Sequence, residues 1–133
     1  LLSGTPRNVD VGNDNKDVVI TARDENGDTA RQSFTITVTN VNDSPTFTST
    51  PVPTATEDVE YNYTATIQDV DAGDSVTLTG TTIPRWLTFT ASSGLLKGTP
   101  TNDDVGNDNN NDDDNTAKDN SGTSVTQSFT ITV

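Results

Sequence analysis

The chain uses two stretches of its sequence twice, and this internal repeat limits what it can fold into. Residues 1–15 recur at 95–109 with three differences, and residues 21–38 recur at 116–133, so that both copies end on QSFTITV. The shift is 94 residues for the first block (1 to 95) and 95 for the second (21 to 116), so one residue has been inserted between them. A period near a hundred residues is typical of tandem domains and not of a short solenoid. The sequence therefore predicts the C-terminal half of one module at 1–39, a joint at 40–45 and a complete module at 46–133.

Alternation of apolar and polar residues predicts that each module is built from β-strands. Phe34, Ile36 and Val38 alternate with threonines, residues 129–133 repeat the pattern, and YNYTATI at 61–67 alternates in the same way. A period of two with abundant threonine is typical of antiparallel strands that are buried on one face. Asn-Gly at 26–27 and Ser-Gly at 121–122 are hairpin signals between such runs. We therefore expect an all-β fold, an antiparallel β-sandwich in tandem modules.

The apolar residues of the complete module define its predicted core. We interpret Trp86, which lies within the apolar stretch IPRWLTF, as a core residue rather than as an exposed platform for stacking a sugar. The predicted core consists of Tyr61, Tyr63, Ile67, Val76, Leu78, Trp86, Leu87, Phe89, Leu95, Leu96, Phe129, Ile131 and Val133.

One segment breaks the agreement between the two copies. The first copy reads KDVVITARD at 16–24, whereas the second reads NNNDDDNTAKD at 109–119. Because burying such polar residues in a strand is costly, either this strand is lost in the second module, or the run is a loop, or the assigned sequence is in error there. Asp108, Asn110 and Asp112 alternate as in a calcium loop, but the Gly and the later Glu of an EF-hand are missing. We therefore expect a solvated loop.

Composition excludes several classes of function. The net charge is −13, which disfavours nucleic acid and anionic membrane surfaces as partners. The chain has no Cys, His or Met, so disulfides, the usual zinc sites and histidine-based catalysis are excluded. No apolar run has the length of a membrane span, and we expect no membrane insertion. A chain this acidic either recruits cations, for which calcium is the usual choice, or uses its charge only to remain soluble.

Acidic residues gather around the predicted joint. The joint reads TNVNDSP at 39–45, and Asn42 and Asp43 within it can be met by Asp69 and Asp71 from the next module. Carboxylates two residues apart on an extended chain lie on the same side but ~7 Å apart, so the pair needs a turn to converge, and Gly73 provides one. Paired carboxylates also occur in glycosidases, but these lie in a turn without a predicted pocket, and we expect no enzymatic activity. Calcium binding and a polar, solvated linker both remain open at this point.

The same segments resemble a known family. ARDENGDTARQSFTITVTNVNDSPTF at 22–47 resembles the close of a cadherin repeat, and DVDAGD at 69–74 resembles the cadherin Asp-x-Asp motif. TIPRWLTFTASSGLLKGTPTNDDVG at 82–106 resembles the bacterial cadherin-like, dystroglycan-type modules, which are immunoglobulin-like repeats of large secreted or surface proteins. The resemblance implies calcium held at the joint, with Asn40 and Asp119 as further ligands. Asn40 stands where the family has Asp, and Ser44 where it has Asn.

The resemblance implies a non-enzymatic role outside the cell or at its surface. The leading hypothesis is a stalk or spacer module of a long bacterial adhesin-like protein, stiffened by calcium at the module joint. One alternative is a filament subunit that is assembled by strand complementation between chains, since residues 1–39 are half a sandwich. Another is a carbohydrate-binding accessory module of a secreted polysaccharide-degrading enzyme. The expected partners are neighbouring modules of the same or another copy of the chain, with cell-surface glycans or proteins open as further partners.

Overall fold

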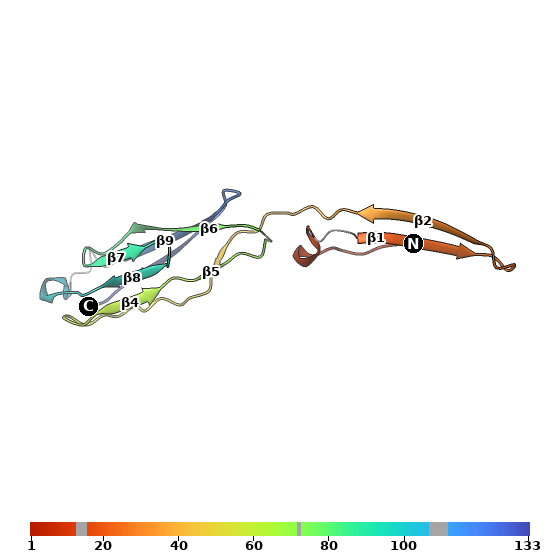
Figure 1. Cartoon of the computed structure of the whole chain (residues 1–133). Helices are drawn as coiled ribbons and strands as arrows, with labels where there is room; N and C mark the ends of the chain where they lie inside the picture. The colour runs from red at the N-terminus through yellow and green to blue at the C-terminus, as the bar shows by residue number, and fades with distance from the viewer. Residues whose placement is uncertain (13–15, 72, 107–111) are drawn as a thin grey trace. The chain divides into compact units, whose positions relative to one another are not determined.

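The chain folds into two compact units that consist of β-strands and turns. The computed structural model describes residues 1–12, 16–71, 73–106 and 112–133. Residues 1–42 form the first unit and residues 43–133 the second (Figure 1). All pairings between named strands are antiparallel, which confirms the predicted all-β fold. In the described residues, no helical segment has the length and hydropathy of a membrane span.

The first unit is one β-hairpin preceded by a short 3-10 turn. The turn is η1 (Asn8–Asp10), and the hairpin joins β1 (Lys16–Arg23) to β2 (Thr29–Ile36). Val18 stands opposite Phe34, and Ile20 opposite Gln32. Gly27 has a φ of +96°, a conformation that favours glycine, so the Asn-Gly signal lies at the hairpin turn as predicted.

The second unit consists of two three-stranded sheets and one short pair of strands. One sheet has the order β10–β9–β6, the other β4–β8–β7, and the short pair is β3–β5. A 3-10 turn, η2 (Asn102–Asp104), follows β8. The strands are β3 (Thr46–Phe47), β4 (Tyr61–Thr64), β5 (Ile67–Gln68), β6 (Val76–Thr82), β7 (Leu87–Thr90), β8 (Leu95–Gly98), β9 (Asp112–Asp119) and β10 (Ser124–Thr130).

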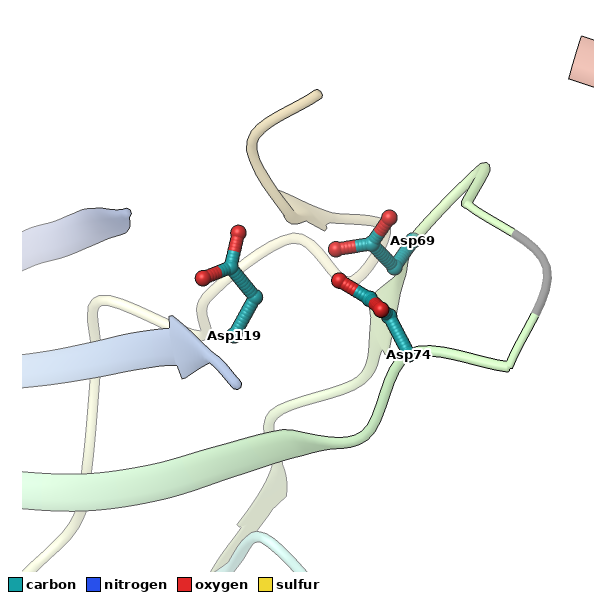
Figure 2. Close-up of side chains that lie close together, drawn as sticks. All are labelled: Asp69, Asp74 and Asp119. Carbon is teal, nitrogen blue, oxygen red and sulfur yellow. The ribbon is translucent and has the colours of Figure 1, made fainter. Parts of the chain in front are cut away.

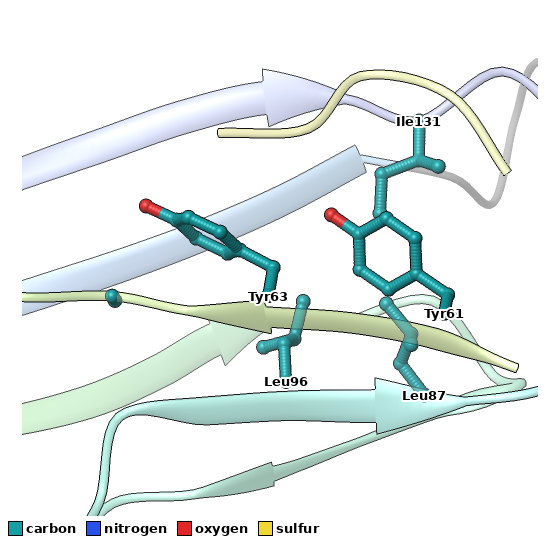
Figure 3. Packing of buried hydrophobic residues seen from close by; sticks show 6 residues of the cluster. Tyr61, Tyr63, Leu87, Leu96 and Ile131 are labelled. Carbon is teal, nitrogen blue, oxygen red and sulfur yellow. The ribbon is translucent and has the colours of Figure 1, made fainter. Parts of the chain in front are cut away.

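The core of the second unit joins its two sheets. Tyr63 of β4 packs edge-to-face on Phe129 of β10, with ring centroids 5.5 Å apart. Tyr61 packs in the same way on Trp86 at 5.7 Å, which places Trp86 against the core as predicted. Of the predicted core, the buried residues are Tyr61, Tyr63, Leu78, Leu87, Leu96 and Ile131, most of which are visible in Figure 3. The half-buried ones are Ile67, Val76, Trp86, Phe89, Leu95, Phe129 and Val133.

The polar run that we expected to be a loop is largely a strand, and this corrects the prediction. Residues 112–119 form β9, in which Asp113 and Asn115 are 0% exposed. The polar run can form a buried strand because β6 and β10 flank β9 and pair with its main-chain N–H and C=O groups, and this pairing does not depend on the side chains. The residues 107–111, which include the predicted loop residues Asp108 and Asn110, lie outside the described part.

Burial of Asp113 is costly for the fold. The Asn115 amide donates a hydrogen bond to Asp113 Oδ1, but the buried Asp113 Oδ2 has no hydrogen-bond partner. Burial raises the pKa of Asp113 to about 6, against the lowering effect of the Asn115 hydrogen bond. The first hairpin has Val18 and Ile20 at the corresponding register positions. The second unit therefore keeps the strand and carries a polar pair in its interior.

Candidate metal centre

Three carboxylates converge at one end of the second unit. Asp69 follows β5, Asp74 precedes β6, and Asp119 is the last residue of β9. One oxygen of each lies within 4.8 Å of the others, and Figure 2 shows the three side chains pointing toward one another. Like charges at this separation repel one another unless a cation or a proton lies between them. We call these three residues the acidic cluster.

The loop between β5 and β6 brings Asp69 and Asp74 together. The main-chain N–H of Asp71 donates to Asp69 Oδ1 at 2.9 Å, and that of Asp74 donates to the Asp71 carbonyl at 3.3 Å. Gly73 has a φ of +90°, which a residue with a side chain adopts only under strain. The turn that we expected Gly73 to provide is therefore present, and it returns the chain so that Asp74 lies beside Asp69.

The hairpin between β9 and β10 fixes the third carboxylate. Asp119 Oδ1 accepts the main-chain N–H groups of Gly122 at 2.6 Å and Thr123 at 2.8 Å. The Thr123 hydroxyl donates to Asp119 Oδ2. Asp119 is buried by this arrangement. Its carboxylate is thus pre-oriented by the turn and needs no rearrangement to act as a ligand.

Several oxygens around the cluster lack the hydrogen bonds that buried oxygens need. The buried atoms Asp69 Oδ2, Asp71 Oδ1 and Asp74 Oδ2 have no hydrogen-bond partner. Burial, followed by repulsion from Asp69, Asp71 and Asp119, raises the pKa of Asp74. Unsatisfied buried oxygens are costly, and a bound cation would satisfy them. The ion pairs of the described part that join Arg85 to Asp104 and Lys97 to Glu60 lie outside this region.

Asp71 connects this loop to the start of the unit. It is 5% exposed, and its Oδ2 accepts the main-chain N–H of Asp43 at 2.6 Å. Residue 43 is where the chain enters the second unit. The loop that supplies two members of the acidic cluster therefore also holds the entering chain.

The predicted ligands lie in three different settings. Asp69 and Asp119 belong to the acidic cluster, and Asp71 lies in the same loop. Asp43 is exposed and meets Asp71 through its main chain. Asn40 and Asn42 belong to the first unit, and their role as ligands stays a prediction.

Asp74 is the member of the cluster that sequence reasoning missed. The signal was available, because DVDAGD ends on Asp74, directly after the glycine of the turn. From the Asp-x-Asp spacing we predicted Asp71 as the second ligand of the loop, whereas the turn at Gly73 places Asp74 in the cluster. A turn glycine followed by a carboxylate is therefore the pattern that could have identified it.

The donor set suits a hard cation. Calcium prefers six to eight oxygen ligands, and carboxylates are the strongest of these. The chain offers no thiolate or imidazole that would favour zinc or copper. The residues present therefore fit calcium, with the remaining coordination positions open to main-chain carbonyls or water.

The second unit is also similar to a known family. Residues 44–133 match a family described as "Putative Ig domain", and the matched range includes all three members of the acidic cluster and strands β3 to β10. No curated protein matches the chain.

Proposed function

The chain belongs to the Putative Ig domain family, and we propose that it is a non-enzymatic stalk or spacer module of a long extracellular, adhesin-like bacterial protein. In this proposal, calcium binds at the acidic cluster and stiffens the chain where it enters residues 43–133. The observation that carries the proposal is the convergence of three carboxylates whose buried oxygens are partly unsatisfied.

Calcium would be held mainly by the acidic cluster. Asp69, Asp74 and Asp119 supply one oxygen each in the arrangement described. Asp71 adds a buried carboxylate in the same loop, whose Oδ1 has no hydrogen-bond partner. A bound divalent cation removes the mutual repulsion of these groups and fixes the ends of β5, β6 and β9 together.

Stiffening would follow from the hydrogen bond between Asp71 and Asp43. When the loop of residues 69–74 is fixed by calcium, Asp71 is fixed with it, and so is the main chain at Asp43. A spacer needs such a restraint, because a linker without it is flexible. Calcium at the millimolar level outside cells is sufficient for sites of extracellular modules.

The carbohydrate-binding alternative draws no support from the aromatic residues considered for it. Tyr61 and Tyr63 are each 5% exposed, and the Tyr61 hydroxyl donates to the Val52 carbonyl at 2.9 Å. Trp86 packs on Tyr61. Tyr61 and Tyr63 are therefore core residues that do not offer a flat face to a sugar, and Trp86 is half-buried against the same core.

Thermal unfolding with and without calcium tests the proposal. The chain has a single tryptophan, Trp86, so its fluorescence follows the second unit. At a calcium concentration a hundred times the dissociation constant, binding to the folded state alone adds about 2.7 kcal/mol. For a unit of this size the midpoint should rise by on the order of 10 °C or more. An unchanged midpoint would contradict calcium binding.

The Asp74→Asn variant makes the test sharper because its effect should change sign with calcium. In chelator we expect a higher midpoint than wild type, since the substitution removes a charge that the neighbouring carboxylates repel. In calcium we expect a lower midpoint than wild type, since a ligand is lost. Asp114→Asn is the matched control, because it removes one charge from the second unit outside the acidic cluster, and its midpoint should respond to calcium as that of wild type does.

A further inference from the structure

The two copies of the repeat place the same apolar residues in different surroundings. Leu96 and Ile131 are 0% exposed in the second unit, whereas their counterparts Leu2 and Ile36 are 60% and 42% exposed in the first. The residues are identical, and the two hairpins have the same register. The difference therefore comes from what covers these residues in the second unit. The first unit presents the corresponding face without that cover.

Residues 46–94, which we call the front half, supply the cover in the second unit. They have no counterpart in residues 1–42. Within the front half, β4 pairs with β8 so that Tyr63 stands opposite Leu96, and Tyr63 also packs on Phe129. Leu87 belongs to the same core (Figure 3). The partner that would complete the first unit therefore has the chemistry of a front half.

The outer edge of β1 offers the main-chain groups that a further strand needs. Within the described residues, β1 pairs with β2 alone, whereas β9 is flanked by both β10 and β6. An open strand edge is a template for the addition of another strand. In the second unit, Leu78 of β6 stands opposite Ala117 of β9. In the repeat, Ala22 of β1 corresponds to Ala117 of β9. A strand that is added to β1 in the same register would therefore place its Leu78 opposite Ala22.

An apolar groove lies beside β1 in the first unit. It is lined by residues that include Leu2, Pro6, Val18, Ile36 and Val38. Two of these, Leu2 and Ile36, are the residues whose counterparts are fully buried in the second unit. The groove therefore coincides with the face that the front half covers in the second unit.

The exposed face of β1 in the first unit is more apolar than the covered face of β9 in the second unit. Val18 and Ile20 stand in β1 where β9 has Asp113 and Asn115. Burying apolar surface stabilises by about 25 cal/mol per Å². The corresponding polar pair instead leaves a carboxylate oxygen without a hydrogen-bond partner. The first unit is thus the better acceptor for an apolar strand.

We propose that residues 1–42 bind the front half of a module, an extended polypeptide with the strand pattern of residues 46–94. The bound polypeptide adds a strand to β1 in the register of β6 on β9, and covers Leu2 as β4 covers Leu96. It is not the front half at residues 46–94, because those residues already pair with residues 95–133. The inference goes beyond the calcium-binding stalk and does not depend on it.

The test adds a fluorescently labelled polypeptide of residues 46–94 to the full chain. We expect saturable binding, measured as a rise in anisotropy, and none with a scrambled polypeptide of the same composition. Ile36→Asp in the full chain should weaken binding at least tenfold, because it puts a charge on the covered face. Val19→Asp is the matched control and should change binding less than twofold. Val19 lies on the opposite face of β1, and its counterpart in the second copy is Asp114.

The register can be tested separately, because the chain has no cysteine. Leu78→Cys in the polypeptide and Ala22→Cys in the chain should form a disulfide under mild oxidation. Ile20→Cys in place of Ala22→Cys should cross-link much less, because it lies two residues out of register. Absence of saturable binding, equal binding to the Ile36→Asp variant, or preferred cross-linking at Ile20→Cys would each overturn the proposal. A dimer of the chain alone that Ile36→Asp dissociates would also overturn it, since a second copy of the face would then be the occupant.

Discussion

Replacing Asp113 by Asn should stabilise the second unit at neutral pH, and the reason lies in the interior of the sandwich. Asp113 is 0% exposed, and its pKa is raised from 3.8 to about 6 chiefly by burial. Below about pH 3 the carboxyl is protonated in both the folded and the unfolded chain, since its ordinary pKa is 3.8. Between about pH 4 and pH 6 the unfolded chain loses this proton while the folded chain keeps it, so the free energy of unfolding falls as the pH rises.

The magnitude follows from the shift in pKa. A difference of one unit corresponds to about 1.4 kcal/mol, so the ionisation of Asp113 lowers the free energy of unfolding by about 3 kcal/mol at pH 7. Asp113→Asn has the same shape and no charge, and it retains an oxygen that can accept the Asn115 amide hydrogen bond. The stability of the variant relative to wild type should therefore increase by about 3 kcal/mol between about pH 3 and pH 7. At pH 7 this is a rise in midpoint on the order of 10 °C or more.

The assay is urea unfolding followed by Trp86 fluorescence at several pH values in the presence of chelator. Comparing the variant with wild type cancels the contribution of the other carboxylates, since these are common to both. Asp114→Asn is the matched control, because it removes one charge from the next residue on the opposite face of β9. It should change stability by less than about 0.5 kcal/mol. A difference between Asp113→Asn and wild type that stays constant from pH 4 to pH 7 would refute the reasoning.

Two further predictions use the repeat as an internal control. Leu96→Ala should destabilise the second unit by about 2–5 kcal/mol in urea unfolding, because it leaves a cavity in a fully buried site. Its counterpart Leu2→Ala should change stability by less than about 0.5 kcal/mol, and an equal effect of both would contradict the assigned burial. Gly98→Ala should lower the urea midpoint clearly, because the added Cβ would lie 1.9 Å from a main-chain oxygen. Gly4→Ala, which has nothing within 4 Å of the added Cβ, should be neutral, and comparable losses would argue against this packing.

The strands and hairpins could be predicted from the sequence because their signals are local. Alternation in 61–67 and 129–133 predicts which face is buried, whereas Phe34 and Ile36, which alternate in the same way, are exposed in the first unit. The Asn-Gly and Ser-Gly pairs mark turns wherever the flanking strands lie. The repeat then extended each assignment from one copy to the other. These features need no knowledge of the partners across the sheet.

The polar strand and Asp74, the third acidic residue of the loop, were not found in this way. β9 forms because β6 and β10 flank it, and the alternation rule, which considers one segment at a time, does not include that stabilisation. Asp74 joins the acidic cluster because the chain closes at Gly73 and because the far end of β9 brings Asp119 to the same place. The formation of β9 and the convergence of the acidic cluster both depend on contacts between segments that are distant in the sequence. The Asp-x-Asp spacing alone therefore predicted Asp71 and not Asp74.

The measurement that tests the calcium-stiffened spacer most directly is the distribution of distances between the two units. Spin labels at Glu25→Cys and Ser92→Cys report on the first and second units, and the chain has no other cysteine to react. We expect calcium to narrow the distribution clearly in the wild-type background and to leave it unchanged when Asp74→Asn is added. A distribution that is equally broad with calcium and with chelator would contradict the account, because calcium would then not restrain the chain at Asp43.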